Sequence, residues 1–194
     1  MRAVCRLAAQ VMAAVVAAVR PGVPTAELDQ LAERLITDGG GRPAFKGYRG
    51  YPCSTCISIN EELIHGIPGP RLIAPGDVVS VDLGVVLDGL MGDMARTVAV
   101  SPVPGDIARM VATVEEGFAA ACAAVRAGAR VGDISHAVQS LCEARGYGIV
   151  RDYVGHGIGR QLHEPPQIPN FGQPGSGPEL PAGATLAIEP MITL

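Results

Sequence analysis

Two aspartates between residues 78 and 100 have the type and spacing of a site that holds a cation or a shared proton. Asp88-Gly89 is a short-turn signal between two apolar runs, so this stretch is predicted to form a β-hairpin. In that hairpin Asp82 lies opposite Ala95, and Asp93 is its diagonal neighbour on the same face. Two buried carboxylates repel unless they share a proton or bind a cation. A solvent-facing hairpin with scattered acids explains these residues equally well.

The histidines are the next candidates for chemistry. His156 and His163 lie among glycines and prolines in GHGIGRQLHEPP (155–166). Glycines on both sides of His156 allow a close approach of the backbone to another group. The glycine spacing lacks the dinucleotide pattern and a following helix, so a phosphate loop is excluded. His136 falls on a predicted helix, and we give it no role.

An oxygen-rich donor set with one imidazole follows if Glu189 joins these residues. The set comprises Asp82, Asp93, His156 and Glu189. It favours Mn, Fe or Co over a closed structural zinc site. Bridging carboxylates are typical of two-metal centres, which acidify a water molecule and polarise a carbonyl group. Hydrolysis of an amide is the reaction that such a centre suggests.

Composition bounds the class of protein. The 194 residues are 48% hydrophobic and 18% charged, which is typical of a globular chain. A net charge of -4 without a basic cluster argues against nucleic-acid binding, and no apolar run is long enough to cross a bilayer. Five scattered cysteines favour free thiols in a reducing compartment. Cys53-Ser-Thr-Cys56 lacks the second pair of a zinc ribbon and is interpreted as packing or pocket lining.

The predicted elements occur twice. Each copy has two helices followed by an acid-bearing strand, with helices at 3–19, 25–38, 105–125 and 133–144. Arg20-Pro21-Gly22 is matched by Arg126-Ala127-Gly128 at an offset of 106 (126 − 20), and Asp82 by Glu189 at 107 (189 − 82). Thr25 is the predicted N-cap of the second helix. Because the partner of the first helix is mid-chain, the apolar run 11–19 is interpreted as structure and not as a signal peptide.

We therefore expect one α+β domain over 1–194, with half-repeats of about 1–101 and 102–194. A short strand is predicted at 57–59, after a Gly/Pro/Tyr loop over 42–55. The second copy is expected to stop after the strand of Glu189, without a turn or a returning strand. A last strand of the sheet is thus expected to be missing.

Four motifs carry a resemblance to a known family. SINEELIHGIP (58–68), VDLGVVLDGLMGDMARTVAV (81–100), GHGIGRQLHEPPQIPN (155–170) and AIEPMI (187–192) resemble type I methionine aminopeptidase, in order and along the whole chain. The resemblance implies the pita-bread fold, in which two αα-ββ halves related by a pseudo-twofold surround a curved antiparallel sheet. It implies metal-dependent removal of N-terminal methionine from nascent proteins and peptides. It further implies a cytoplasmic monomer with neither nucleic acid nor membrane as a partner.

The resemblance also assigns roles to residues. It implies two divalent ions, Mn, Fe or Co with Zn or Ni as alternatives, bound by Asp82, Asp93, His156 and Glu189, with Asp93 bridging. Three residues match catalytic positions. His65 lies near the scissile amide, His163 contacts the substrate carbonyl and stabilises the oxyanion, and Glu189 accepts a proton from water. His65 and His163 also contact substrate, and the methionine pocket walls are Tyr48, Tyr51, Cys56 and Leu162.

The family continues beyond EPMITL through a pocket tryptophan to a second bridging glutamate, which this chain lacks. Truncation, a degenerate paralogue and half of a complemented pair would each explain this. Two other functions therefore stay open. One is a prolidase or Xaa-Pro aminopeptidase, although those relatives usually carry an N-terminal domain and lack the Tyr/Cys pocket loop. The other is a non-catalytic or impaired module that binds peptide or protein, against which the retained polar residues count.

Overall fold

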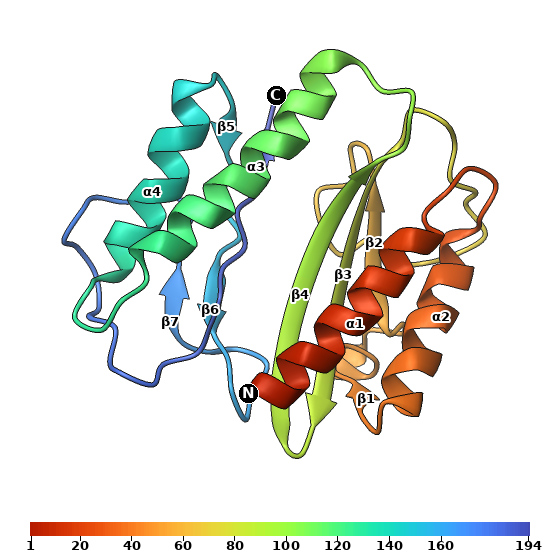
Figure 1. The fold of residues 1–194 in the computed structure, drawn as a ribbon, viewed down its shortest axis with the longest axis horizontal. Coiled ribbons are helices and arrows are strands. Elements are labelled where there is room, and N and C mark those ends of the chain that lie inside the picture. The colour runs from red at the N-terminus through yellow and green to blue at the C-terminus, as the bar shows by residue number, and fades with distance from the viewer. The chain divides into compact units, whose positions relative to one another are not determined.

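The computed structural model describes all residues, 1–194, and they form two compact units. Unit 1 comprises Met1–Pro104 with Gly159–Leu162, and unit 2 comprises Gly105–Ile158 with His163–Leu194. Both units combine two helices with antiparallel strands (Figure 1). A mixture of helices and antiparallel strands is the α+β class that the sequence predicts.

Unit 1 is built on a central strand. Its helices are α1 (Arg2–Ala18) and α2 (Thr25–Asp38), and its strands are β1 (Arg42–Pro43), β2 (Thr55–Ile59), β3 (Val78–Leu87) and β4 (Leu90–Ala99). A short 3-10 helix covers Tyr48–Gly50. β3 pairs with β4 along its whole length, and its other edge pairs with β1 and β2 in tandem. Every other strand of unit 1 is therefore hydrogen-bonded to β3.

The core of unit 1 lies between the helices and one face of β3. Alternate residues of β3 are completely buried there: Val79, Val81, Leu83 and Val85. α1 and α2 lie side by side over this face (Figure 1), and α1 buries residues three or four positions apart, such as Val4, Leu7, Val11 and Val15. Burial of each such side chain stabilises the fold by about 1.5–3 kcal/mol. Because β-strand side chains alternate, Asp82 lies on the opposite face.

Unit 2 repeats the plan with shorter strands. Its elements are α3 (Gly105–Ala124), α4 (Val131–Ala144), β5 (Gly148–Ile149), β6 (Gly155–Gly157), β7 (Glu164–Ile168), β8 (Leu186–Ala187) and β9 (Ile192–Thr193). β6 pairs with β7 and with β8, and β5 pairs with β9. α3 and α4 lie side by side (Figure 1), and the core includes Ala121, Ile134, Val138, Cys142 and Ile168. β6, which carries His156, is thus the middle strand of its sheet.

The internal repeat recurs in backbone hydrogen bonds. After α1 the Gly22 N–H donates to the Ile73 carbonyl (2.8 Å), and after α3 the Gly128 N–H donates to the Leu180 carbonyl (3.0 Å). These partners are separated by 106 (128 − 22) and 107 (180 − 73), the offsets that the sequence indicates. Both glycines have positive φ (85° and 82°), which explains why the turns match at this residue type.

One predicted helix cap is wrong. Thr25 is the first residue of α2, and Pro24 is the N-cap. The Thr25 hydroxyl donates to the Gly69 carbonyl (3.1 Å) and accepts from the Gly69 N–H (2.9 Å), so it joins a distant segment to the helix and does not cap it. A long-range hydrogen bond has no signal in the local sequence.

The prediction for the end of the second copy is also wrong in part. Glu189 does not lie within a strand, because β8 ends at Ala187 and β9 begins at Ile192. Pro190 lacks the N–H that a continuous ladder would need at this point. The strand that follows Glu189, β9, pairs with β5 and not with β8, so it is not a returning strand.

Candidate functional site

Unit 1 places a pair of carboxylates on the face of the hairpin away from the helices. Asp82 is in register with Ala95, and Asp93 is in register with Gly84, so the two aspartates are diagonal neighbours, as the sequence predicts. Cys56 on β2 is in register with Asp82 on the other side. Burial raises the pKa of the Cys56 thiol to about 12, and the negative charges of both aspartates act in the same direction. Both carboxylates therefore lie near one buried neutral thiol.

Unit 2 places an imidazole beside a carboxylate. His156 Nε2 lies 3.1 Å from Glu189 Oε1, and the His156 side chain is only 7% exposed. His156 Nδ1 lies 2.8 Å from the Gly157 carbonyl, which fixes the ring and directs Nε2 to the carboxylate. Glu189 Oε1 is buried and receives no hydrogen bond of regular geometry. A cation suits such an oxygen next to an imidazole nitrogen, so this pair fits a divalent metal ion.

The glycines beside His156 are required by close packing. A Cβ atom on Gly155 would lie 2.4 Å from the Ala187 carbonyl oxygen, and one on Gly157 would lie 2.2 Å from the Pro165 carbonyl oxygen. Only glycine therefore allows β6 to fit between β7 and β8 at this point. The prediction that these glycines permit a close approach of the backbone is confirmed.

Asn170 is a functional candidate that sequence reasoning missed. Its Nδ2 donates to the backbone carbonyl of Glu189 at 2.8 Å, and the residue is 2% exposed. It thereby holds the segment that carries the Glu189 carboxylate. The only signal in the sequence was an asparagine in the irregular stretch after Ile168, and that signal does not name its partner.

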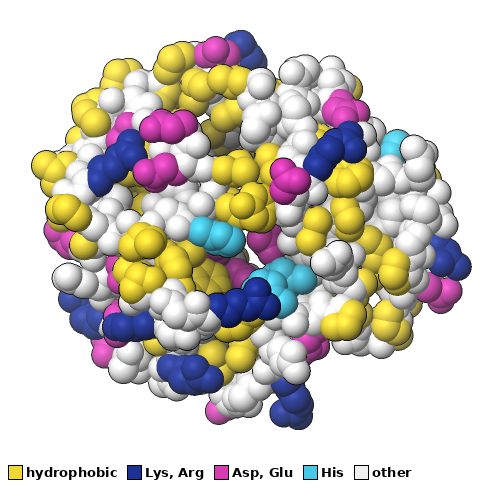
Figure 2. Space-filling view, turned by 180° about the vertical axis from the view of Figure 1, so that it is seen from behind, with side chains coloured by type: hydrophobic (Ala, Val, Ile, Leu, Met, Phe, Trp, Pro, Cys, Tyr) yellow, Lys and Arg dark blue, Asp and Glu magenta, His cyan; other side chains and the backbone are white.

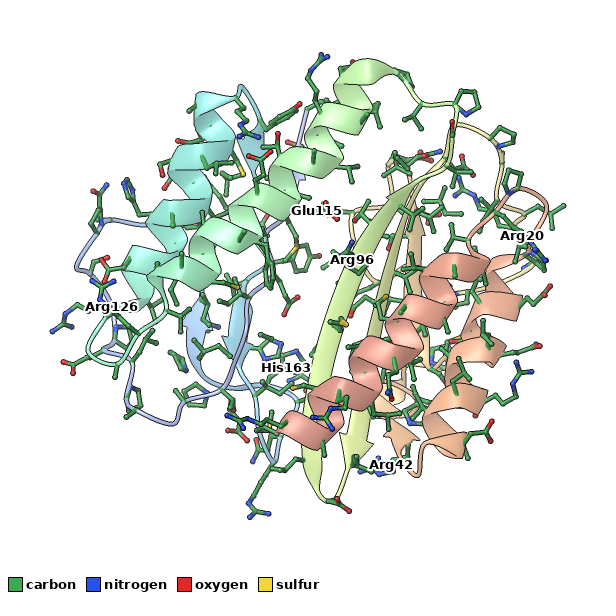
Figure 3. All side chains as sticks on the ribbon, viewed as in Figure 1. Arg20, Arg42, Arg96, Glu115, Arg126 and His163 are labelled. Atoms are coloured by element: carbon green, nitrogen blue, oxygen red, sulfur yellow. The ribbon has the colours of Figure 1, made fainter.

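The two other predicted histidines are exposed. His163 lies just before β7 (Figure 3), and its ring centroid is 4.3 Å from that of His156, with the rings tilted by 54°. His65 belongs to unit 1, in the segment that follows β2. Its φ is 59°, in the left-handed region that costs a non-glycine residue about 1–2 kcal/mol.

The predicted pocket residues all belong to unit 1. The Tyr51 hydroxyl donates to the carbonyls of Thr55 (3.0 Å) and Gly66 (3.1 Å), and burial raises the pKa of this phenol. Tyr48 is partly buried in the 3-10 helix, whereas Cys56 is fully buried.

Leu162 is a buried residue of the Gly159–Leu162 segment. The Met91 N–H donates to the Gly159 carbonyl at 2.7 Å, which joins this segment to the hairpin. Leu162 is thereby placed in unit 1, the same unit as the two tyrosines and Cys56.

The surface carries charges of both signs. On the face shown in Figure 2, acidic and basic side chains are interspersed. Among the helices, none is both long enough and apolar enough to cross a membrane.

Known proteins match this chain along most or all of its length. The model of metallopeptidase family M24 matches residues 1–194. The methionine aminopeptidase of Clostridium acetobutylicum is 50% identical, with 90% of this chain and 70% of that protein covered. Methionine aminopeptidase 1 of Mycobacterium tuberculosis is 44% identical, with 100% and 76% covered.

Solved structures show the same fold. The methionine aminopeptidase of Thermotoga maritima has a TM-score of 0.97 and 41% identity, with 99% of this chain and 78% of that chain covered. The prolidase of Pyrococcus furiosus has a TM-score of 0.82 and 26% identity, with 97% and 53% covered. The predicted fold class is confirmed by these likenesses.

Proposed function

This chain belongs to metallopeptidase family M24, and from that premise we propose that it removes the N-terminal methionine from nascent proteins and peptides. It is a hydrolase of this family. The observation that carries the proposal is its 50% identity to a methionine aminopeptidase over 90% of its length. The solved prolidase shares only 26% identity, which supports methionine over Xaa-Pro substrates.

The proposed cofactor is a pair of divalent metal ions, Mn, Fe or Co, with Zn or Ni as alternatives. The residues that would hold the ions are Asp82 and Asp93 from unit 1 and His156 and Glu189 from unit 2. Support comes from the diagonal aspartates of the hairpin and from the 3.1 Å contact between His156 and Glu189. When bound, the ions acidify a water molecule and polarise the scissile carbonyl group.

Residues of the chain itself would then accept the proton from water and stabilise the negative charge that develops on the substrate. The Glu189 carboxylate accepts the proton that the attacking water loses. His163 donates a hydrogen bond to the substrate carbonyl oxygen as negative charge develops on it. His65 holds the scissile amide. Exposure of both histidines supports these roles, because each must meet a substrate that arrives from solvent.

The proposed methionine pocket is neutral and polarizable. Its walls are Tyr48, Tyr51, Cys56 and Leu162. Burial raises the pKa of Cys56 to about 12, so in the metal-free protein its sulfur is a protonated thiol at neutral pH. A neutral thiol and two phenol rings suit the thioether of methionine.

Peptide hydrolysis by the purified 194-residue chain tests this function. With added Mn or Co we expect release of methionine from Met-Ala-Ser and no comparable hydrolysis of Ala-Pro. The matched control is the same protein after treatment with a chelator. Turnover of Met-Ala-Ser no faster than this control would overturn the proposed activity and leave a peptide-binding module. Preference for Ala-Pro would assign an Xaa-Pro enzyme.

We further propose that the protein acts as a monomer in the cytoplasm, on the N-terminal peptides of nascent chains. The five cysteines are all free, which supports a reducing compartment. Light scattering coupled to gel filtration would give the mass in solution. A value near the 20.0 kDa of one chain supports the monomer, and twice that mass contradicts it.

A further inference from the structure

Asp29 on α2 makes an unusual set of contacts with the start of β2. One of its oxygens, Oδ1, accepts hydrogen bonds from the Ser54 N–H (3.0 Å), the Thr55 N–H (2.8 Å) and the Thr55 hydroxyl (2.8 Å). Ser54 and Thr55 are both completely buried. Hydrogen bonds to an ionised carboxylate are about twice as strong as neutral ones, so Asp29 firmly joins α2 to β2.

Glu33, one helical turn later, adds a weaker second connection. It accepts a hydrogen bond from the Ser54 hydroxyl (3.0 Å), and Lys46 Nζ donates to both of its oxygens (2.7 and 2.9 Å). The Lys46 and Glu33 side chains are 49% and 38% exposed, and exposed ion pairs stabilise a fold little. Asp29 is therefore the stronger of the two connections.

The contacts of Asp29 lead directly to the proposed pocket. Thr55 is in register with Leu83 on the helix-covered face of the sheet, whereas the next residue, Cys56, is in register with Asp82 on the opposite face. The Thr55 carbonyl accepts from the Tyr51 hydroxyl, which also donates to the carbonyl of Gly66. One carboxylate thus fixes the strand that presents Cys56 and the carbonyl that orients Tyr51.

We propose that Asp29 is a positioning residue of the methionine pocket: from behind the sheet, it sets the positions of Cys56 and Tyr51. This inference rests on the proposed function, because the pocket is assigned through it. Asp29 does not contact the substrate. Its effect reaches the substrate only through β2 and Tyr51.

Thiol labelling tests the positioning without any need for turnover. We compare Asp29→Asn and Asp29→Ala with Asp38→Asn, which makes the same change at the exposed end of α2. Modification of Cys56 by iodoacetamide, followed by mass spectrometry of peptides, is expected to be at least tenfold faster in Asp29→Ala and intermediate in Asp29→Asn. Cys142, completely buried in unit 2, is the internal control and should keep its rate.

Two labelling results would overturn the inference. Equal acceleration of Cys56 and Cys142 would mean that Asp29 supports only general stability. Unchanged labelling of Cys56 in Asp29→Ala would mean that the pocket wall does not depend on Asp29.

Kinetics on Met-Ala-Ser test the effect on substrate. In Asp29→Asn we expect KM to rise at least fivefold with kcat within twofold of the unchanged protein, because the pocket holds the side chain and not the reacting bond. Affinity for Mn, measured by calorimetry, should not change. A fall in kcat at constant KM would overturn the role. If the unchanged protein shows no turnover, the proposed function fails, whereas the labelling result still decides whether Asp29 fixes Cys56.

Discussion

At the scale of single residues, the backbone of unit 2 determines how His156 can act. A carbonyl oxygen can only accept, so the contact between Nδ1 and the Gly157 carbonyl places a proton on Nδ1. Nε2 is the atom beside Glu189 Oε1. A ring held in this way is ready to act as a metal ligand and loses little freedom when it binds.

Replacement of His156 tests its role as a ligand. We expect His156→Ala to weaken Mn binding at least tenfold and to abolish turnover, because an imidazole donor is lost. His136→Ala, the same change at an exposed position of α4, is the matched control and should have no effect. The measurement is calorimetric titration with Mn.

The same titration shows whether the two ligand pairs serve one centre. If they do, the loss of Mn affinity in the double variant Asp93→Asn, His156→Ala should differ from the sum of the two single losses, because both residues act on the same centre. Losses that add fully would contradict a common centre.

At the scale of elements, the sequence predicts the hairpin of β3 and β4, but it does not predict the hydrogen bonds by which Asp29 joins α2 to β2. Asp88 and Gly89 have φ of 52° and 73°, the two positive values that a two-residue turn needs, and Asp-Gly is a local signal for this turn. The contact between Asp29 and Thr55 spans 26 residues, so no periodicity reveals it. The strands β8 and β9 could not be predicted from the sequence either, because each has only two residues and depends on its partner strand.

The fit of β6 between its neighbours can be tested with one methyl group. In Gly157→Ala the new Cβ would lie 2.2 Å from a carbonyl oxygen of the backbone, so β6 or β7 must move. We expect a loss of about 1–3 kcal/mol in the free energy of unfolding, measured with urea. Gly69→Ala is the control, because its nearest atom would be 3.9 Å away. Equal stability of the two variants would show that β6 has room.

The start of α4 should give unit 2 a pH-dependent contribution to stability. Asp133 accepts from the N–H groups of Arg130 (2.8 Å) and Gly175 (2.7 Å), and these bonds lower the pKa of its carboxyl group below the usual 3.8. A pKa lowered by folding stabilises the folded state above the unfolded value, and this contribution is lost as the pH falls through the folded pKa.

We therefore expect Asp133→Ala to lower the melting temperature by about 2–4 °C at pH 7, because the N–H of the N-cap residue, Arg130, loses its side-chain acceptor. The difference from the unchanged protein should shrink steadily below pH 4. Asp106→Ala makes the same change at an exposed position in the first turn of α3 and serves as the comparison. A gap that persists at low pH would contradict the assignment to Asp133.

At the scale of the whole molecule, removal of metal should destabilise the protein. A ligand that binds only the folded state stabilises it by about 2.7 kcal/mol at one hundred times its dissociation constant. We expect chelation to lower the melting temperature and added Mn to restore it. In Glu189→Gln the effect of Mn should be much smaller. The same shift in both proteins would point to nonspecific binding.

The left-handed backbone of His65 has a practical consequence for engineering. Glycine adopts φ of 59° without strain, and the relief of about 1–2 kcal/mol exceeds the added chain entropy of about 0.4–1 kcal/mol. A library selected only for heat resistance should thus recover His65→Gly, with a slightly higher melting temperature and severely reduced peptide cleavage. Asp88→Gly, at φ of 52° in the hairpin turn, should likewise raise the melting temperature slightly, and it should keep the peptidase activity. Selection for thermal stability and selection for catalytic activity would therefore favour different residues at position 65.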